Sequence, residues 1–89
     1  MKELLTGFDG RGEVRGFHFI QLKKSDKGYL YRKTFDDFVS CEVFEQRINT
    51  LFNCVSYPSS KSFGMWAWDF SDFNKAIIKF NSLQNDKTF

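Results

Sequence analysis

The pattern of apolar and polar positions predicts a β-hairpin in the first third of the chain. Residues 14–23 read Val-Arg-Gly-Phe-His-Phe-Ile-Gln-Leu-Lys, a run rich in β-favouring side chains, and residues 29–34 alternate in a similar way. The segment 24–28 between them is polar and ends in Gly28, which can adopt a positive φ. We therefore expect two antiparallel strands joined by a short loop.

A helical pattern follows in the middle of the chain. Apolar residues recur there at helical spacing, at Phe44, Ile48, Leu51, Phe52 and Val55, and predict a first helix over about residues 41–53 with Ser40 as its N-cap. Residues 35–39 are ambiguous, because the polar residues from Thr34 to Asp37 could themselves cap an earlier helix start.

The last third of the chain predicts one more strand and one more helix. Residues 56–62 form a loop by composition, and residues 63–70 read as a short aromatic strand. Ser71 is the expected N-cap of a second helix with Asp72 in its first turn, and one face of this helix carries Phe73, Ala76, Ile77, Phe80 and Leu83.

These elements predict a single α+β domain spanning residues 1–89. Domains typically contain about 100–200 residues, so a chain of 89 residues holds one hydrophobic core. The expected order is ββαβα, a three-stranded and mainly antiparallel sheet with two helices packed on one face. Residues 1–12 are expected to be a flexible N-terminal segment, and residues 84–89 a fraying tail.

One face of such a sheet would be left without helices, and alternation along the strands suggests which residues lie there. If the more aliphatic positions face the helices, the outer face is an aromatic platform edged with cations: Arg15, Phe17, Phe19, Lys23, Tyr29, Tyr31, Lys33, Trp66 and Trp68. Arg32 then faces inward, which counts against this scheme, and one reversed strand would bury the two tryptophans. A homodimer core built on Trp66 and Trp68 is a further alternative.

Charge and composition restrict the partners of this domain. The net charge is only +2, but residues 1–33 carry eight basic and four acidic groups and form the only region suited to a polyanion. The chain shows neither an apolar run long enough to cross a membrane nor the apolar region of a signal peptide, which predicts a cytoplasmic protein without a membrane partner. Abundant Phe, Lys, Asn and Ser beside scarce Ala and Pro is typical of short accessory proteins of bacteriophages.

Candidate catalytic and metal-binding residues are few. Cys41 and Cys54 stand beside a single histidine, His18, so a four-ligand zinc site of Cys and His cannot be assembled, and reduced, buried thiols are expected instead. A nucleophile needs a neighbouring base, and no local motif pairs His18 with either cysteine. We therefore expect no catalytic residues, no metal and no cofactor.

The segment from Arg15 to Leu22 resembles the eight-residue signature of the RNA-recognition-motif family. Arg15, Gly16, Phe17 and Phe19 match that signature, while His18 and Leu22 depart from it. In that family the octamer lies on the third strand of its domain, whereas only about 14 residues precede it here, so the resemblance does not extend to the fold. It implies that Phe17 and Phe19 could stack on bases.

Two functional hypotheses follow. The first is a small non-enzymatic interaction protein, such as a phage-type inhibitor or modulator, that binds a protein partner through the aromatic face with Trp66, Trp68, Phe17, Phe19, Tyr29 and Tyr31. The alternative is a protein that binds RNA or another single-stranded nucleic acid, with the same Phe and Tyr residues stacking on bases and with phosphates held by Arg15, Lys23, Lys24, Lys27 and Lys33.

Overall fold

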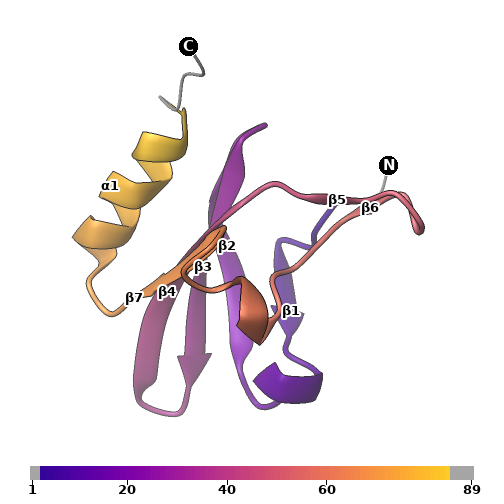
Figure 1. Ribbon diagram of the computed structural model, residues 1–89. Helices are drawn as coiled ribbons and strands as arrows, with labels where there is room; N and C mark the ends of the chain where they lie inside the picture. Colours follow the sequence, from indigo (N-terminus) through magenta and orange to yellow (C-terminus); the bar gives the residue numbers. More distant parts are fainter. Residues whose placement is uncertain (1–2, 85–89) are drawn as a thin grey trace.

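A computed structural model describes residues 3–84 and shows an antiparallel sheet of five strands (Figure 1). The strand order is β1-β2-β3-β4-β7, and every neighbouring pair is antiparallel. The strands are β1 (Gly7–Asp9), β2 (His18–Lys24), β3 (Gly28–Phe35), β4 (Phe38–Glu45) and β7 (Ala67–Phe70). The two edges of the sheet are therefore formed by β1 and β7.

Four shorter elements and one α-helix complete the described chain. A two-stranded hairpin is formed by β5 (Ile48–Asn49) and β6 (Cys54–Val55), and single 3-10 turns occur at η1 (Gly12–Val14) and η2 (Ser60–Ser62). The helix α1 (Phe73–Gln84) follows β7. No helix in the described part of the chain is both long and apolar enough to cross a membrane.

The predicted hairpin is confirmed, because β2 and β3 pair in antiparallel register from His18 opposite Thr34 to Lys24 opposite Tyr29. A bulge between Gln21 and Lys23 shifts the alternation near the end of β2, which places Lys23 opposite Leu30. The simple alternation expected along residues 14–23 therefore holds only up to the bulge.

The predicted fold of three strands with two helices is wrong, although the α+β class is correct. The expected first helix over residues 41–53 is instead the strand β4 followed by the β5–β6 hairpin. Alternate β4 residues pack on opposite faces of the sheet, Glu42 and Phe44 on one and Cys41 and Val43 on the other, so the whole middle of the strand is buried. A strand buried on both faces loses its apolar–polar alternation, which is why the sequence pattern did not reveal it.

Two turns replace the expected helix start and the expected helix body. Asp36 adopts a φ of 51° in the two-residue turn between β3 and β4, a conformation that Asp tolerates better than most residues. Asn53 has a φ of 52° in the β5–β6 turn, where the Asn49 side chain accepts hydrogen bonds from the amides of Leu51 and Phe52. These local bonds favour a turn over a helix.

The ends of the chain are partly as expected. Helix α1 is confirmed, but its N-cap is Asp72 and not Ser71, because the Asp72 carboxylate accepts the Asn74 amide at 2.8 Å. The expected strand 63–70 begins only at Ala67. The N-terminal segment 1–12 contains the strand β1, and of the expected tail 84–89 only Gln84 lies within the described residues.

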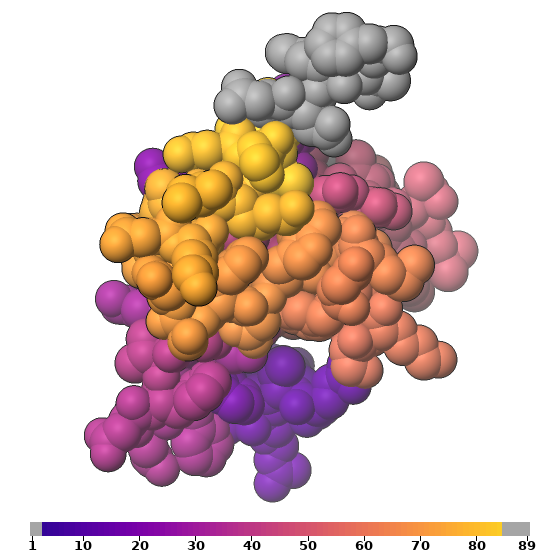
Figure 2. Space-filling view, turned by 60° about the vertical axis from the view of Figure 1, so that its left-hand side comes forward, coloured from indigo at the N-terminus to yellow at the C-terminus, as the bar shows by residue number. Residues whose placement is uncertain are grey.

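Both faces of the sheet are covered. Helix α1 packs one face with Ala76, Phe80 and Leu83, which meet Leu30 and Val43 of the sheet. Figure 2 shows this helix across the front of the molecule, with the β3–β4 turn projecting beyond it. The opposite face is covered by the long connection from β6 to β7, and its core consists of Phe19, Tyr29, Tyr31, Phe44, Val55 and Ala67. The sheet therefore separates two apolar cores.

Candidate functional site

Only part of the predicted aromatic face comes together on one side of the sheet, and the centre of that part is buried. Phe19, Tyr29 and Tyr31 share one face of the sheet and are each 0% exposed. Tyr57, from the connection between β6 and β7, lies over them and meets the rings of Phe8, Phe19 and Phe44 at 5.9, 5.4 and 5.4 Å between centroids. These three predicted binding residues therefore form a core and are not available to a partner.

The two tryptophans lie on opposite faces of the sheet and do not form one patch. Trp66 packs on the core beneath Tyr57, whereas Trp68, opposite Val43 in the register, packs on the helix side. Both are partly buried and carry a cation over the ring, with Arg47 at 5.2 Å from Trp66 and Lys79 at 3.9 Å from Trp68. Binding by these side chains stays a prediction, but the structure does not bring them together.

Phe17 lies outside the centre of the buried aromatic core and apart from both tryptophans, at the end of the sheet that carries the β3–β4 turn. Its ring lies 5.3 Å from Phe35 and 5.9 Å from Phe38, two side chains that are exposed near the turn. Phe17 itself is partly buried and packs at the rim of the core. It lies on the opposite face of the sheet from Trp68, and no ring contact joins it to Trp66 within the described residues.

The predicted phosphate-binding residues are also dispersed. Lys33 is buried and ion-paired, and Lys24 pairs with Glu3. Arg15 precedes β2, whereas Lys23 and Lys27 lie near the other end of the hairpin, about 20 Å away at the rise of a β-strand. The exposed cations do not form one continuous patch, and nucleic-acid binding stays a prediction without a surface to support it.

A mostly buried polar cluster, with Asp69 at its exposed edge, lies between the aromatic core and Phe17. The Lys33 ammonium donates to Glu42 at 2.9 Å and to Asp69 at 2.8 Å, and the Tyr57 hydroxyl donates to the other oxygen of Glu42. Glu42 is only 1% exposed. We call these four residues the Lys33 network. Three strands and the β6–β7 connection contribute to it, so it forms only when the sheet is complete.

Electrostatics fixes the protonation of the Lys33 network. Burial alone would lower the pKa of Lys33, but the hydrogen bonds to Asp69 and Glu42 outweigh it and raise that pKa. Burial raises the pKa of Tyr57, and the Glu42 carboxylate raises it further. Lys33 therefore stays charged and the Tyr57 phenol stays protonated, so neither group is prepared to act as a base.

A cavity of about 380 Å³ borders the Lys33 network. Its polar walls are Lys33, Glu42, Asp69 and Glu13, and the Glu13 carboxylate accepts the Ser60 amide at 2.7 Å. Every charged group of this wall thus has a partner within the chain. The contacts fasten the β6–β7 connection to η1 and to the sheet.

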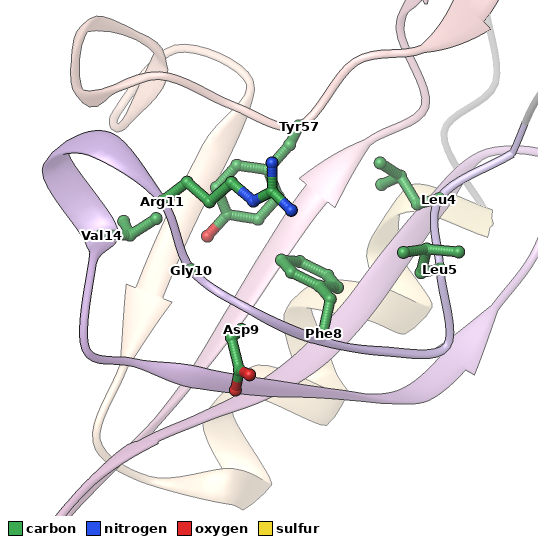
Figure 3. A pocket seen from close by; sticks show the side chains of 8 residues that line it. All are labelled: Leu4, Leu5, Phe8, Asp9, Gly10, Arg11, Val14 and Tyr57. Carbon is green, nitrogen blue, oxygen red and sulfur yellow. The ribbon is translucent and has the colours of Figure 1, made fainter.

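A second cavity, of about 500 Å³, lies beside β1 (Figure 3). Its walls are mainly apolar and come from the segment 4–14 together with Tyr57: Leu4, Leu5, Phe8, Asp9, Gly10, Arg11, Val14 and Tyr57. We call it the Arg11 cavity. Val14 lines both cavities and therefore lies between them.

Arg11 supplies the charge that faces this second cavity. In Figure 3 its guanidinium extends over the middle of the cavity, while the Asp9 carboxylate points away. Asp9 is engaged on the other side of the sheet, where its carboxylate lies 2.9 Å from His18. Among residues 3–84, no carboxylate forms an ion pair with Arg11.

The remaining candidate groups are separated from both cavities. Cys41 is a free, buried thiol on the helix side of the sheet, and burial raises its pKa, while Cys54 is a free, partly buried thiol in β6. In the described part of the chain, no group of three His, Cys, Asp or Glu side chains is placed to hold a metal ion.

Comparison with known proteins adds no relative: no family model, no curated protein and no solved structure matches this chain.

Sequence reasoning missed Tyr57, Glu42 and Arg11 as important residues. Glu42 falls within the helix expected over residues 41–53, and Tyr57 falls within the loop expected over residues 56–62. Arg11 lies in a Gly-rich segment whose spacing matches no phosphate-binding motif. A lone Arg between two glycines next to a possible edge strand was the available signal, because such a segment allows close approach of another chain.

Proposed function

We propose that this chain is a small, non-enzymatic interaction domain that binds a larger protein partner at the Arg11 cavity. The observation that carries the proposal is an apolar cavity of about 500 Å³ at a sheet edge, with an arginine over it that forms no ion pair with a described residue. Concave apolar sites with a few polar groups are typical of binding sites. Arginine is enriched among the residues that dominate binding energy.

The state of the titratable groups supports a non-enzymatic role. The charge of Lys33 is balanced by two carboxylates, and the Tyr57 phenol is held protonated. The Cys41 thiol is buried under α1, away from His18, which pairs with Asp9 on the surface. None of these groups combines a free nucleophile with a free base, as catalysis of acyl or phosphoryl transfer would require.

The protein partner expected from the sequence is kept, but its proposed site is the Arg11 cavity instead of the aromatic face. The residues expected to bind it are core residues or lie far apart, whereas Leu5 is 62% exposed beside the cavity. Action as an inhibitor or modulator of that partner is part of the same hypothesis.

The test is a selection of random ten-residue peptides, displayed on phage, against the full chain. The Leu5→Asp variant places a carboxylate in the cavity wall and should lose the selected peptides. The matched control is Leu51→Asp, because Leu51 is 82% exposed on the β5–β6 turn and lines neither cavity. Equal binding by Leu5→Asp and the unmodified chain, or no enrichment at all, would overturn the proposal.

A further inference from the structure

Among residues 3–84, the strand β1 is an edge of the sheet and no described segment pairs with its outer side. It ends the strand order, and within the described part of the chain it pairs with β2 alone. Edge strands present backbone groups that can pair with another chain, and many proteins cover or shorten such edges. The free edge of β1 lies beside the Arg11 cavity, because Phe8 and Asp9 of β1 and the following Gly10 belong to the cavity wall.

Backbone hydrogen bonds around β1 show which of its groups face outward. The Thr6 carbonyl accepts the Gln21 amide at 2.7 Å, and the Gly10 amide donates to the Phe17 carbonyl at 2.7 Å. In an antiparallel pair these bonds recur at every second residue, so the backbone amide and carbonyl of Phe8 also face β2. Gly7 and Asp9 therefore direct their amides and carbonyls away from the sheet.

The side chains along β1 favour the approach of another strand. Gly7 has no side chain, is exposed and would meet no atom closer than 3.8 Å if it carried a Cβ, so a second backbone can approach it. Phe8 points to the cavity side and stacks on Phe19 at 4.8 Å. A residue opposite Phe8 on an added strand would point to the same side, about 5 Å away, and enter the cavity.

We infer that the partner binds by adding an extended strand to β1, with an apolar side chain in the cavity and an acidic side chain on Arg11. This inference rests on the proposed function and names its mode of recognition. Main-chain hydrogen bonds to Gly7 and Asp9 supply affinity, and the cavity together with Arg11 supplies specificity. Charge complementarity selects an acidic segment, because Arg11 faces the cavity with no carboxylate of the described chain paired to it.

The test uses a peptide from the display selection, synthesised with an N-methyl group at each backbone amide in turn. Strand addition predicts that methylation at alternate positions weakens binding at least tenfold, while the intervening positions tolerate it. Hydrogen–deuterium exchange supplies a second readout, in which the peptide should protect the amides of Gly7 and Asp9. Uniform tolerance of methylation without this protection would overturn strand addition, while dependence on Leu5 would leave the proposed function intact.

Variants of the protein give independent checks. Gly7→Pro removes one outward amide without removing a bond to β2 and should abolish binding, whereas Gly7→Ala should keep it.

Arg11→Met should weaken binding about ten- to hundredfold, and the control Arg32→Met, at an exposed position of β3, should not. If the selected peptides contain no Asp or Glu and bind Arg11→Met as tightly as the unmodified protein, the inference that the partner strand is acidic would be overturned.

A second copy of the chain is the competing occupant. Light scattering of the purified protein should give a monomer that retains peptide binding. A dimer that Leu5→Asp dissociates would place β1 against β1 of another copy and overturn the inferred partner.

Discussion

The two cavities beside Tyr57 differ in how their charges are satisfied. In the cavity next to the Lys33 network, the Lys33 ammonium binds both Glu42 and Asp69, and the Glu13 carboxylate accepts a backbone amide. In the Arg11 cavity, the guanidinium has no carboxylate of the described chain as its ion-pair partner. Both cavities share Val14 and border the same connection, so the difference is one of electrostatics and not of location.

Paired and unpaired charges in a cavity wall have different roles. Charges that are paired within the chain hold its segments together, and removing one partner leaves the other buried without compensation. A charge without a partner adds little to folding and remains free for a ligand. We therefore expect the Lys33 network to stabilise the fold, while binding at the Arg11 cavity is our proposal.

The largest expected effect is on stability, from Lys33→Met. This change leaves Glu42, which is 1% exposed, without its cation and should lower the free energy of unfolding by about 3–5 kcal/mol in urea titrations. The triple variant Lys33→Met, Glu42→Leu, Tyr57→Phe removes the buried charges together with the phenol and should be more stable than Lys33→Met. If Lys33→Met were as stable as the unmodified protein, the stabilising role of the Lys33 network would be contradicted.

Tyr57→Phe should have a smaller effect on stability, about 1.5–3 kcal/mol. It keeps the ring over Phe8, Phe19 and Phe44 and removes only the hydrogen bond to the buried Glu42 carboxylate. Urea titration measures this loss. A much larger loss with an altered near-ultraviolet circular dichroism spectrum would show that the hydroxyl also orders the connection.

High pH should weaken the Lys33 network. The pKa values of Lys33 and Tyr57 are both raised in the folded protein, from ordinary values of 10.5 and 10.0. Between those values and the folded ones, the unfolded chain releases protons that the folded chain retains, so stability falls as pH rises above about 10. Each group contributes at most about 1.4 kcal/mol per pH unit. Urea titrations at pH 9 and 11 should show a smaller decrease for Tyr57→Phe; an equal decrease would exclude a contribution from Tyr57.

The smallest stability effect is expected at Arg11. Arg11→Met should change the free energy of unfolding by no more than about 0.5 kcal/mol, because Arg11 lies at an exposed position without an ion pair to a described residue. Thermal and urea unfolding of Arg11→Met and of Lys33→Met, measured side by side, give the difference in stability loss directly. A loss comparable to that of Lys33→Met would remove the distinction between the two cavities.

Local patterns predicted the parts of the fold that depend on neighbouring residues. The β2–β3 hairpin follows from alternation and Gly28, and α1 follows from its apolar stripe. The strand β4 was missed because it is buried on both faces, which leaves no alternation to detect. The site was missed for a related reason: Tyr57 reaches Phe8 and Glu42 across the fold, and no local pattern reports such long-range contacts.

The most direct test of the central claim is a titration of isotope-labelled protein with a selected peptide, followed by the backbone amide signals in nuclear magnetic resonance spectra. The largest shifts should fall within residues 4–14 and at Tyr57, while the signals of Lys33 and Asp69 should change little. Largest shifts around Lys33, or on the β5–β6 turn, would contradict the assignment of binding to the Arg11 cavity.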